Sequence, residues 1–199
     1  MKLSKENKNI IITILIIVLI LIIITLLLLN GYIIPTKLEA EKYEVRGVDV
    51  SKYQGEVDWD KIKEQGISFA FIKATEGSNS KDSYFDKNYE KLKSMDMLLG
   101  CYHFFSFEST GEEQVKNYIN TVGNIENDDS IMLPIIDVEF YGYYKKAKPS
   151  KNWVIEQLQI MLEELEETYR VKPIIYTTME FYDYYIDGEL QDYDIWIRD

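Results

Sequence analysis

The sequence predicts an α/β protein in which helices cover a parallel β-sheet and one membrane-spanning helix precedes that domain. Residues 10–29 are apolar and carry no charge, and from residue 45 onward short apolar runs alternate with amphipathic stretches. The short runs are apolar throughout and do not alternate with polar residues. Strands of this kind are buried on both faces, which is typical of a parallel sheet with a helix after each strand.

The membrane-spanning helix is predicted by twenty consecutive residues, 10–29, which are Ile, Leu or Val at every position except Thr13 and Thr25. A helix of that length spans about 30 Å, the thickness of the hydrocarbon core of a bilayer. A cleaved signal peptide is the alternative, but its apolar region is usually about 7–15 residues long and ends at a site of small residues. The nearest such site, Leu38-Glu39-Ala40, contains a bulky Leu, so we expect an uncleaved signal anchor.

The charges around this helix predict its orientation and the division of the chain. Lys2, Lys5 and Lys8 precede the helix and are opposed by Glu6 alone. An excess of positive charge favours a cytoplasmic N-terminus, here in a single-pass protein of the cell membrane. The expected parts are a cytoplasmic tail (1–9), a transmembrane signal anchor (10–29), a tether (30–44) and an extracellular domain (45–199).

The net charge and the cysteine count exclude several classes of function. The chain carries −12 and its first thirty residues carry +2, so the remainder carries −14 (−12 minus +2). Such an acidic outer domain is unsuited to nucleic acid, whose phosphates are recognised by Lys and Arg. Cys101 is the single cysteine, which excludes an intramolecular disulfide, and neither Cys101 nor His103 has companions at metal-ligand spacing. We therefore expect no nucleic-acid partner, metal ion or organic cofactor.

The outer domain alternates between strands and helices. The expected strands are Arg46–Val50, Ser68–Ala74, Leu98–Phe105, Ile131–Val138, Pro173–Thr177 and Asp194–Ile197. The expected helices are Trp59–Gln65, Phe85–Met95, Glu112–Gly123 and Trp153–Tyr169. Ser150 is the expected N-cap of the last helix. The sheet can close into a barrel or stay open, and the barrel is favoured because Val48-Asp49-Val50-Ser51 contains no Gly-rich phosphate loop.

Candidate functional residues stand at the carboxyl ends of the strands, where parallel α/β proteins gather their active groups. These residues are Asp49, Ser51, Lys73, Thr75, Glu76, Tyr102, His103, Asp137, Glu139 and Tyr176. Asp137 and Glu139 lie two apart in a strand, so both carboxyls face one way, about 6–7 Å apart at the backbone. Two such carboxyls disfavour simultaneous ionisation, and a neutral acid beside an ionised partner suits cleavage of a glycosidic bond.

Plainer interpretations exist for the same residues. Asp137 and Glu139 are also placed to cap the following helix or to pair with Lys145 or Lys146. A lone histidine such as His103 is more often a hydrogen-bonded core or rim residue than a catalytic base.

Ordered motifs give the chain a resemblance to a known family. The motifs are Gly47-Val48-Asp49-Val50-Ser51, Tyr53-Gln54-Gly55, Val57-Asp58-Trp59, Phe71-Ile72-Lys73-Ala74-Thr75-Glu76-Gly77, Gly100-Cys101-Tyr102-His103-Phe104, Leu133-Pro134-Ile135-Ile136-Asp137-Val138-Glu139 and Pro173-Ile174-Ile175-Tyr176-Thr177. Together they resemble glycoside hydrolase family 25, the Chalaropsis-type lysozymes. The likeness runs from about Arg46 to Ile197, nearly the whole outer domain, and an ordered series is far more specific than any one motif.

The resemblance implies a modified TIM-like barrel of five β/α units followed by terminal strands. It also implies a muramidase that cleaves the β-1,4 bond between N-acetylmuramic acid and N-acetylglucosamine in the glycan strands of peptidoglycan. Glu139 would be the general acid, Asp137 would orient the acetamido group of the substrate, and Asp49 would add a further negative charge. The residues expected to bind the glycan are Tyr53, Glu76, Tyr102, His103 and Tyr176.

One departure from the family pattern concerns the C-terminal side. The family continues past the strand that matches Asp194–Ile197 into two more strands, which include a Trp-Gln-Tyr segment and a late Asp, and this sequence stops at Asp199. We therefore expect an incomplete catalytic domain. Three hypotheses remain open: an active muramidase, a truncated and inactive module that binds cell-wall glycan, and a hydrolase of the same fold that acts on chitin-like polymers.

Overall fold

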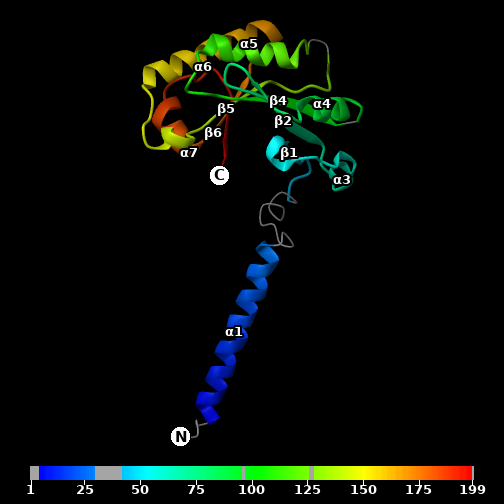
Figure 1. Cartoon of the computed structure of the whole chain (residues 1–199), viewed down its shortest axis with the longest axis vertical. Helices are drawn as coiled ribbons and strands as arrows, with labels where there is room; N and C mark the ends of the chain where they lie inside the picture. The colour runs from blue at the N-terminus through cyan, green and yellow to red at the C-terminus, as the bar shows by residue number, and fades with distance from the viewer. Residues whose placement is uncertain (1–4, 30–41, 96, 126–127, 199) are drawn as a thin grey trace. The chain divides into compact units, whose positions relative to one another are not determined.

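The computed structural model describes residues 5–29, 42–95, 97–125 and 128–198 (Figure 1). The chain divides into two compact units, Met1–Arg46 and Gly47–Asp199. The first contains one long helix, and the second contains a β-sheet with its covering helices.

The long helix α1 extends over Lys5–Leu29. Its segment Asn9–Leu27 has a mean hydropathy of 3.7 and is long and apolar enough to cross a membrane, a property that signal sequences share. The Thr13 hydroxyl donates to the carbonyl of Asn9 at 3.0 Å, and the Thr25 hydroxyl donates to that of Leu21 at 2.9 Å. Because each hydroxyl finds its partner inside the helix, neither threonine adds an unsatisfied polar group to the apolar surface.

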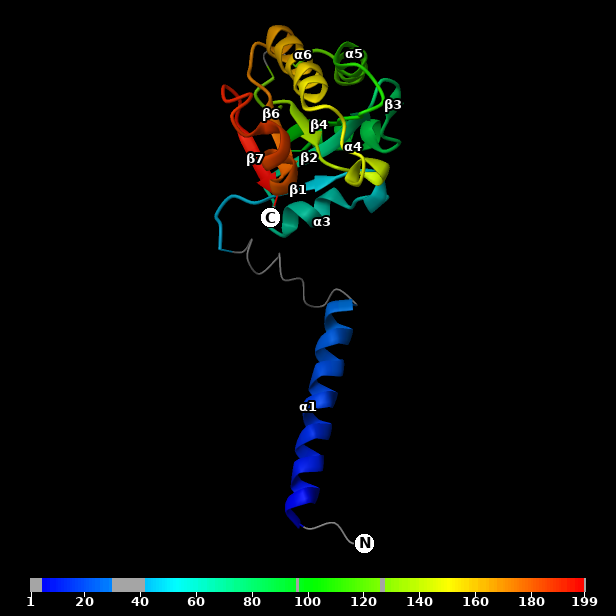
Figure 2. The same ribbon diagram turned by 90° about the vertical axis from the view of Figure 1, so that its left-hand side faces the viewer.

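The second unit is built on a seven-stranded sheet in the order β1-β2-β4-β5-β6-β7, with β3 paired to β2. All neighbours along this path are parallel, and only β3 runs antiparallel. The strands are β1 (Gly47–Val50), β2 (Phe69–Glu76), β3 (Ser80–Lys81), β4 (Leu98–Phe104), β5 (Ile135–Val138), β6 (Ile174–Thr178) and β7 (Ile195–Arg198). The sheet curls into a partial barrel (Figure 2), which confirms the predicted α/β class; the number of β/α units stays a prediction.

The helices of the second unit follow the predicted periodicity closely. The α-helices are α3 (Trp59–Glu64), α4 (Phe85–Lys93), α5 (Gly111–Val122), α6 (Lys151–Tyr169) and the short α7 (Met179–Phe181). The tighter or wider turns are η1 (Lys52–Gln54), η2 (Gly142–Lys145) and η3 (Tyr182–Ile186), of which η3 is π-helical. Ser150 occupies the N-cap position of α6, as predicted, but its side chain makes no capping hydrogen bond.

Helices α5 and α6 lie side by side against the sheet (Figures 1 and 2). The amide of Gly111 donates to Gln157 Oε1 at 2.8 Å. A Cβ at Gly111 would lie 2.4 Å from the Gln157 carbonyl oxygen, so glycine permits this close approach. The residues between the helices and the sheet form the core, which includes Ile72, Leu99, Leu158 and Leu162, each fully buried.

The predicted strand Ile131–Val138 is shorter than expected. Ile131 makes only an isolated bridge to Leu99, and β5 begins at Ile135. Pro134 explains the interruption, because proline has no backbone N–H to donate to a neighbouring strand. The carboxyl end of this strand, which carries Asp137, is where the pattern predicted it.

Candidate active site

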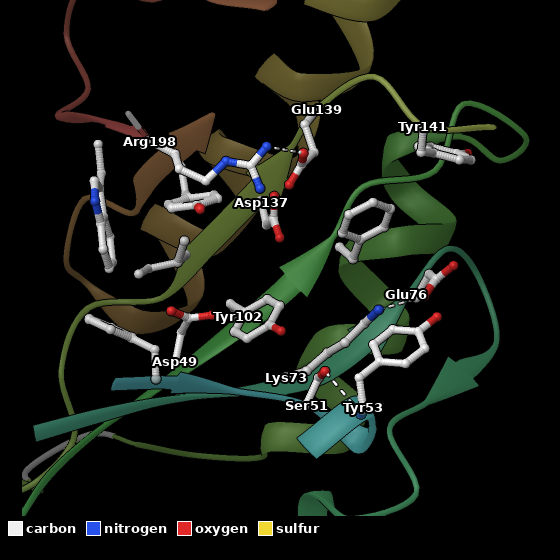
Figure 3. A pocket seen from close by; sticks show the side chains of 15 residues that line it. Asp49, Ser51, Tyr53, Lys73, Glu76, Tyr102, Asp137, Glu139, Tyr141 and Arg198 are labelled. Carbon is white, nitrogen blue, oxygen red and sulfur yellow. Dashed lines mark hydrogen bonds and ion pairs between the residues drawn. The ribbon is translucent and has the colours of Figure 1, made fainter. Parts of the chain in front are cut away.

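A cavity of about 360 Å³ opens on the inner face of the curled sheet, toward the carboxyl ends of the strands. Its lining residues come from every strand of the main path and from the adjoining loops, and Figure 3 shows their side chains converging on it. The lining residues are Asp49, Ser51, Tyr53, Phe71, Lys73, Glu76, Tyr102, Phe104, Ile135, Asp137, Glu139, Tyr141, Tyr176, Trp196 and Arg198.

The strand register brings these residues together. Neighbours in a parallel ladder project to the same face of the sheet, and successive residues of one strand project to opposite faces. One row across the inner face pairs Phe104 with Asp137, Asp137 with Tyr176, and Tyr176 with Trp196. A deeper row pairs Lys73 with Tyr102 and Tyr102 with Ile135. The cavity is therefore a direct consequence of side-chain alternation in a curled parallel sheet.

Asp137 is the most perturbed carboxyl of the cavity. The residue is 9% exposed, and its Oδ1 atom has no hydrogen-bond partner among the residues that the structure describes. Burial, reinforced by the negative charges of Glu139 and Asp49, raises the pKa of Asp137 to about 8, although Lys73 and Arg198 act in the opposite direction. This raised pKa favours the protonated form of Asp137 at neutral pH.

Glu139 has a cationic partner that Asp137 lacks. Arg198 Nη2 donates to Glu139 Oε2 at 3.0 Å, and the Glu139 side chain is 19% exposed. The sequence offered an ion pair with Lys145 or Lys146 as the plainer interpretation of these acids. In the structure, Glu139 pairs with Arg198 of β7 instead. The N-cap position of the following turn η2 belongs to Tyr141, so neither acid caps it.

Lys73 is a buried cation whose charge is already compensated. Its Nζ atom donates to Glu76 Oε2 at 2.6 Å and lies 4.7 Å from the centroid of the Phe104 ring. A buried ammonium needs such a partner, because its desolvation is otherwise very costly. This ion pair also places Glu76 at the edge of the cavity (Figure 3).

Two tyrosines supply neutral phenol groups. Burial, assisted by the charges of Asp137 and Asp49, raises the pKa of Tyr102 well above its usual value. Burial likewise raises the pKa of Tyr176 to about 12. Both hydroxyls therefore keep their protons at physiological pH and can donate hydrogen bonds to a ligand.

Aromatic side chains form the walls of the cavity. The Trp196 ring lies between Phe71, at 5.5 Å between centroids, and Tyr176, at 5.0 Å and perpendicular. A Cβ at Gly100 would lie 2.1 Å from the Phe71 ring, so glycine on β4 makes room for that ring. At the mouth, Tyr53 is 81% exposed. The turn η1 that carries it is held by a hydrogen bond from the Lys52 amide to the buried Asp82 carboxylate at 2.8 Å.

The structure brings together nearly all of the predicted site residues. The predicted residues that line the cavity are Asp49, Ser51, Tyr53, Lys73, Glu76, Tyr102, Asp137, Glu139 and Tyr176, whereas Thr75 and His103 are not among its lining residues. Within the described ranges, no group of three or more His, Cys, Asp or Glu side chains is arranged to hold a metal ion.

His103 does not belong to this cavity, in contrast to the expectation that it binds the glycan. It follows Tyr102 on β4 and therefore projects to the opposite, helix-facing side of the sheet, where it is fully buried. Its Nδ1 atom lies 2.7 Å from Thr75 Oγ1, and its Nε2 atom lies 3.1 Å from Gln114 Oε1. Burial lowers the pKa of His103 to about 4, so the residue is a neutral, hydrogen-bonded core histidine.

Trp196 and Arg198 were not among the predicted site residues. Both belong to β7, whose sequence Ile195-Trp196-Ile197-Arg198 alternates aliphatic side chains with an aromatic and a cation. That period of two was visible in the sequence and indicates that Trp196 and Arg198 share one face. Only the curl of the sheet shows that this face is the one that carries the acids.

A carboxyl pair at the mouth of a curled parallel sheet, flanked by aromatic walls, defines a class of α/β protein suited to carbohydrate chemistry. Comparison with known proteins identifies the family. The profile of the glycosyl hydrolases family 25 matches residues 48–199, and the chain belongs to this family. The resemblance inferred from the ordered motifs is thus confirmed.

Individual relatives agree with this assignment. The chain is 32% identical to YegX of Escherichia coli strain K12 over an alignment of 160 residues. This alignment covers 78% of this chain and 56% of YegX. It is 37% identical over 101 residues to lysozyme M1 of Streptomyces globisporus, which covers 50% of this chain and 34% of that protein. The chain thus spans about half the length, or less, of these relatives.

A solved structure shares the fold. The family 25 glycosyl hydrolase of Bacillus anthracis is 45% identical to this chain and superimposes with a TM-score of 0.75. The match covers 79% of this chain and 71% of that structure.

Proposed function

We propose that this protein is a peptidoglycan hydrolase, a muramidase that cleaves the β-1,4 bond between N-acetylmuramic acid and N-acetylglucosamine. The observation that carries the proposal is the carboxyl pair of Asp137 and Glu139 in the cavity of a family 25 chain. Asp137 is buried and one of its oxygens has no partner within the described part of the chain, whereas Glu139 is more exposed. Environments that differ in this way let two carboxyls take different protonation states and different roles.

In the proposed mechanism, Glu139 gives its proton to the glycosidic oxygen as the bond from that oxygen to the anomeric carbon breaks. The carbonyl oxygen of the substrate acetamido group bonds to the same carbon, and Asp137 orients this group through its N–H. Water then attacks the anomeric carbon, the bond from that carbon to the acetamido oxygen breaks, and the water loses a proton to the Glu139 carboxylate, which restores the acid and the acetamido group. Asp49, at the end of β1, adds negative charge that stabilises the positive charge developing on the sugar.

The remaining cavity residues are proposed to bind the glycan. Tyr53 at the mouth and Trp196 on the wall present flat apolar surfaces of the kind that stack on sugar rings. The neutral phenols of Tyr102 and Tyr176 donate hydrogen bonds to sugar oxygens. Glu76, fixed by Lys73, accepts hydrogen bonds from sugar hydroxyls.

The proposed location follows from the N-terminal helix. We infer that α1 is an uncleaved signal anchor, with residues 1–9 in the cytoplasm and the domain from residue 45 onward outside, at the cell wall. The 19-residue segment Asn9–Leu27 is long and apolar enough to support a membrane span, and the N-terminal lysines support the orientation. Cell fractionation tests this inference: a band of full mass in the membrane fraction supports an anchor, and a shortened soluble product contradicts it.

The function is tested with the full-length chain in mild detergent and purified bacterial cell walls. Wild-type protein is expected to release soluble fragments and new reducing ends, and Glu139→Gln is expected to abolish this release. Glu167→Gln is the matched control, because Glu167 is exposed on α6 and outside the cavity. Folded wild-type protein that releases no reducing ends contradicts the proposal.

A second candidate function is a glycan-binding module without catalysis. The ion pair between Arg198 and Glu139 favours it, because the guanidinium binds the carboxylate that the proposed mechanism uses as the acid. This candidate predicts that wild-type protein sediments with insoluble cell walls but releases nothing from them. Binding no stronger than that of an unrelated acidic protein would exclude it.

A further inference from the structure

The cations of the cavity are distributed unequally among its carboxylates. In the lining of this cavity, Lys73 and Arg198 are the cationic side chains. Lys73 is paired with Glu76 at 2.6 Å, and Arg198 is paired with Glu139 at 3.0 Å. Figure 3 shows the Arg198 guanidinium directed at Glu139, with Asp137 beside them. Asp137 is thus left without a cation of its own.

The groups that face the carboxyl pair come from every strand of the main path. Asp49 on β1 is negative, Lys73 on β2 is neutralised by Glu76, and Arg198 on β7 is bound to Glu139. Tyr102 on β4 and Tyr176 on β6 are neutral phenols. The surroundings therefore favour one negative charge on the pair, located on the member that has the guanidinium.

A buried carboxylate without a partner is strongly unfavourable, whereas a protonated carboxyl is tolerated there. Because Glu139 has the cation and Asp137 has an unpartnered oxygen, one proton shared by the two belongs on Asp137. This is the opposite of the arrangement that the proposed mechanism needs at the moment of bond cleavage, when Glu139 must carry the proton.

We propose that Arg198 is a positioning residue whose ion pair holds the Glu139 carboxylate, and that glycan entry must break this ion pair before Glu139 can act as the acid. The inference rests on the proposed function. Once the pair is broken, the proton passes from the Asp137 carboxyl to the Glu139 carboxylate, with no net gain or loss. Asp137 is then a carboxylate that accepts the acetamido N–H, and Glu139 is ready to protonate the leaving oxygen.

Arg198 is suited to this movement. Its side chain is 53% exposed, so the guanidinium can leave Glu139 for solvent or a substrate oxygen without being buried unpaired. An exposed ion pair is weak, so the contacts of a bound sugar can offset its loss. Separation of Arg198 from Glu139 is therefore compatible with glycan binding.

The test compares kcat/KM as a function of pH in wild type, Arg198→Met and Arg198→Lys, all as full-length chains in detergent. Methionine keeps the apolar stem without the charge. Without the cation, the pair should take up its second proton at higher pH, and a doubly protonated pair has no carboxylate left to accept the acetamido N–H. The acidic limb of the profile should therefore move to higher pH in Arg198→Met and by much less in Arg198→Lys. A loss of activity with an unmoved acidic limb would overturn the proposal, because a bracing or sugar-binding arginine gives that result.

A second readout does not depend on activity. Carboxyl carbon NMR of the Asp- and Glu-labelled chain, assigned with Asp137→Asn and Glu139→Gln, locates the proton directly. At neutral pH, wild type should show Asp137 at the protonated chemical shift and Glu139 at the ionised one, and Arg198→Met should move Glu139 toward the protonated shift. A Glu139 signal that does not respond to Arg198→Met overturns the inference. If wild-type protein cuts no cell wall, the proposed function is wrong. The NMR experiment still shows which carboxyl carries the proton, so the two failures can be told apart.

Discussion

The rings of Phe71 and Trp196 lie 5.5 Å apart between centroids, although β2 and β7 are separated by three strands in the sheet order. A flat sheet would hold strands so placed far apart, since neighbouring strands are about 4.8 Å apart. The contact therefore measures the curl of the sheet. It also forms one wall of the cavity that holds the carboxyl pair.

Replacing Trp196 with alanine is expected to weaken glycan binding more than it slows cleavage. Stacking of an aromatic ring contributes about 0.5–1.5 kcal/mol, so KM should rise by roughly three- to tenfold while kcat changes little. The measurement is steady-state kinetics on soluble peptidoglycan fragments. Trp153→Phe is the control, since Trp153 lies on α6 outside the cavity; equal KM values in wild type and Trp196→Ala would contradict the assignment.

Asp137→Asn should remove activity and yet stabilise the fold at high pH. The folded pKa of Asp137, about 8, lies above the ordinary value of 3.8. The folded state therefore holds a proton that the unfolded chain releases, and wild-type stability falls as pH rises from about 4 to 8. Asparagine has no such proton, so its advantage should grow across this window to roughly 1–3 kcal/mol.

Thermal unfolding followed by near-ultraviolet circular dichroism from pH 4 to pH 9 measures this effect. Asp183→Asn is a suitable control, because Asp183 is exposed on η3. If the melting temperatures of Asp137→Asn and wild type stay parallel over the whole range, Asp137 does not carry the proton.

His103 is expected to affect stability and its pH dependence without a direct effect on cleavage. Its folded pKa of about 4 lies below the ordinary value of 6.5, so wild-type stability falls as pH drops through this interval. His103→Gln should cost about 1–3 kcal/mol at pH 7 through lost hydrogen bonds, and its stability should depend less on pH between 6.5 and 4. If His103→Gln is folded at pH 7 but binds glycan poorly, His103 contributes to glycan binding after all, as the sequence predicted.

Much of the fold was predictable because its signals are local. The helix periods of residues 59–65, 85–95, 112–123 and 153–169 and the uniformly apolar strands correspond to observed elements. Asp137 and Glu139 were predictable for the same reason, since side chains two positions apart in extended chain project to one face, although β5 itself ends at Val138. The short β3 and the turns of residues 179–186 lack such a period and were not predicted.

The rest of the site could not be predicted, because it is formed by strands that are far apart in the sequence. The Arg198–Glu139 ion pair joins residues 59 positions apart, which no local pattern encodes. The sequence showed that His103 lies near the end of a strand, but not to which face of the sheet it points. Tyr102 faces the cavity, so the next residue, His103, faces the helices on the other side. The sequence therefore predicted the carboxyl ends of the strands better than it predicted which side chains point to the inner face of the sheet.

The most direct measurement is the identity of the sugar at the new reducing end. Cell walls digested by the full-length wild-type chain are reduced with borohydride, hydrolysed and analysed by mass spectrometry, with Glu139→Gln in parallel. A muramidase must produce muramitol in the wild-type digest and none above background with Glu139→Gln. A wild-type digest that yields glucosaminitol instead, or no new sugar alcohol at all, would contradict the account.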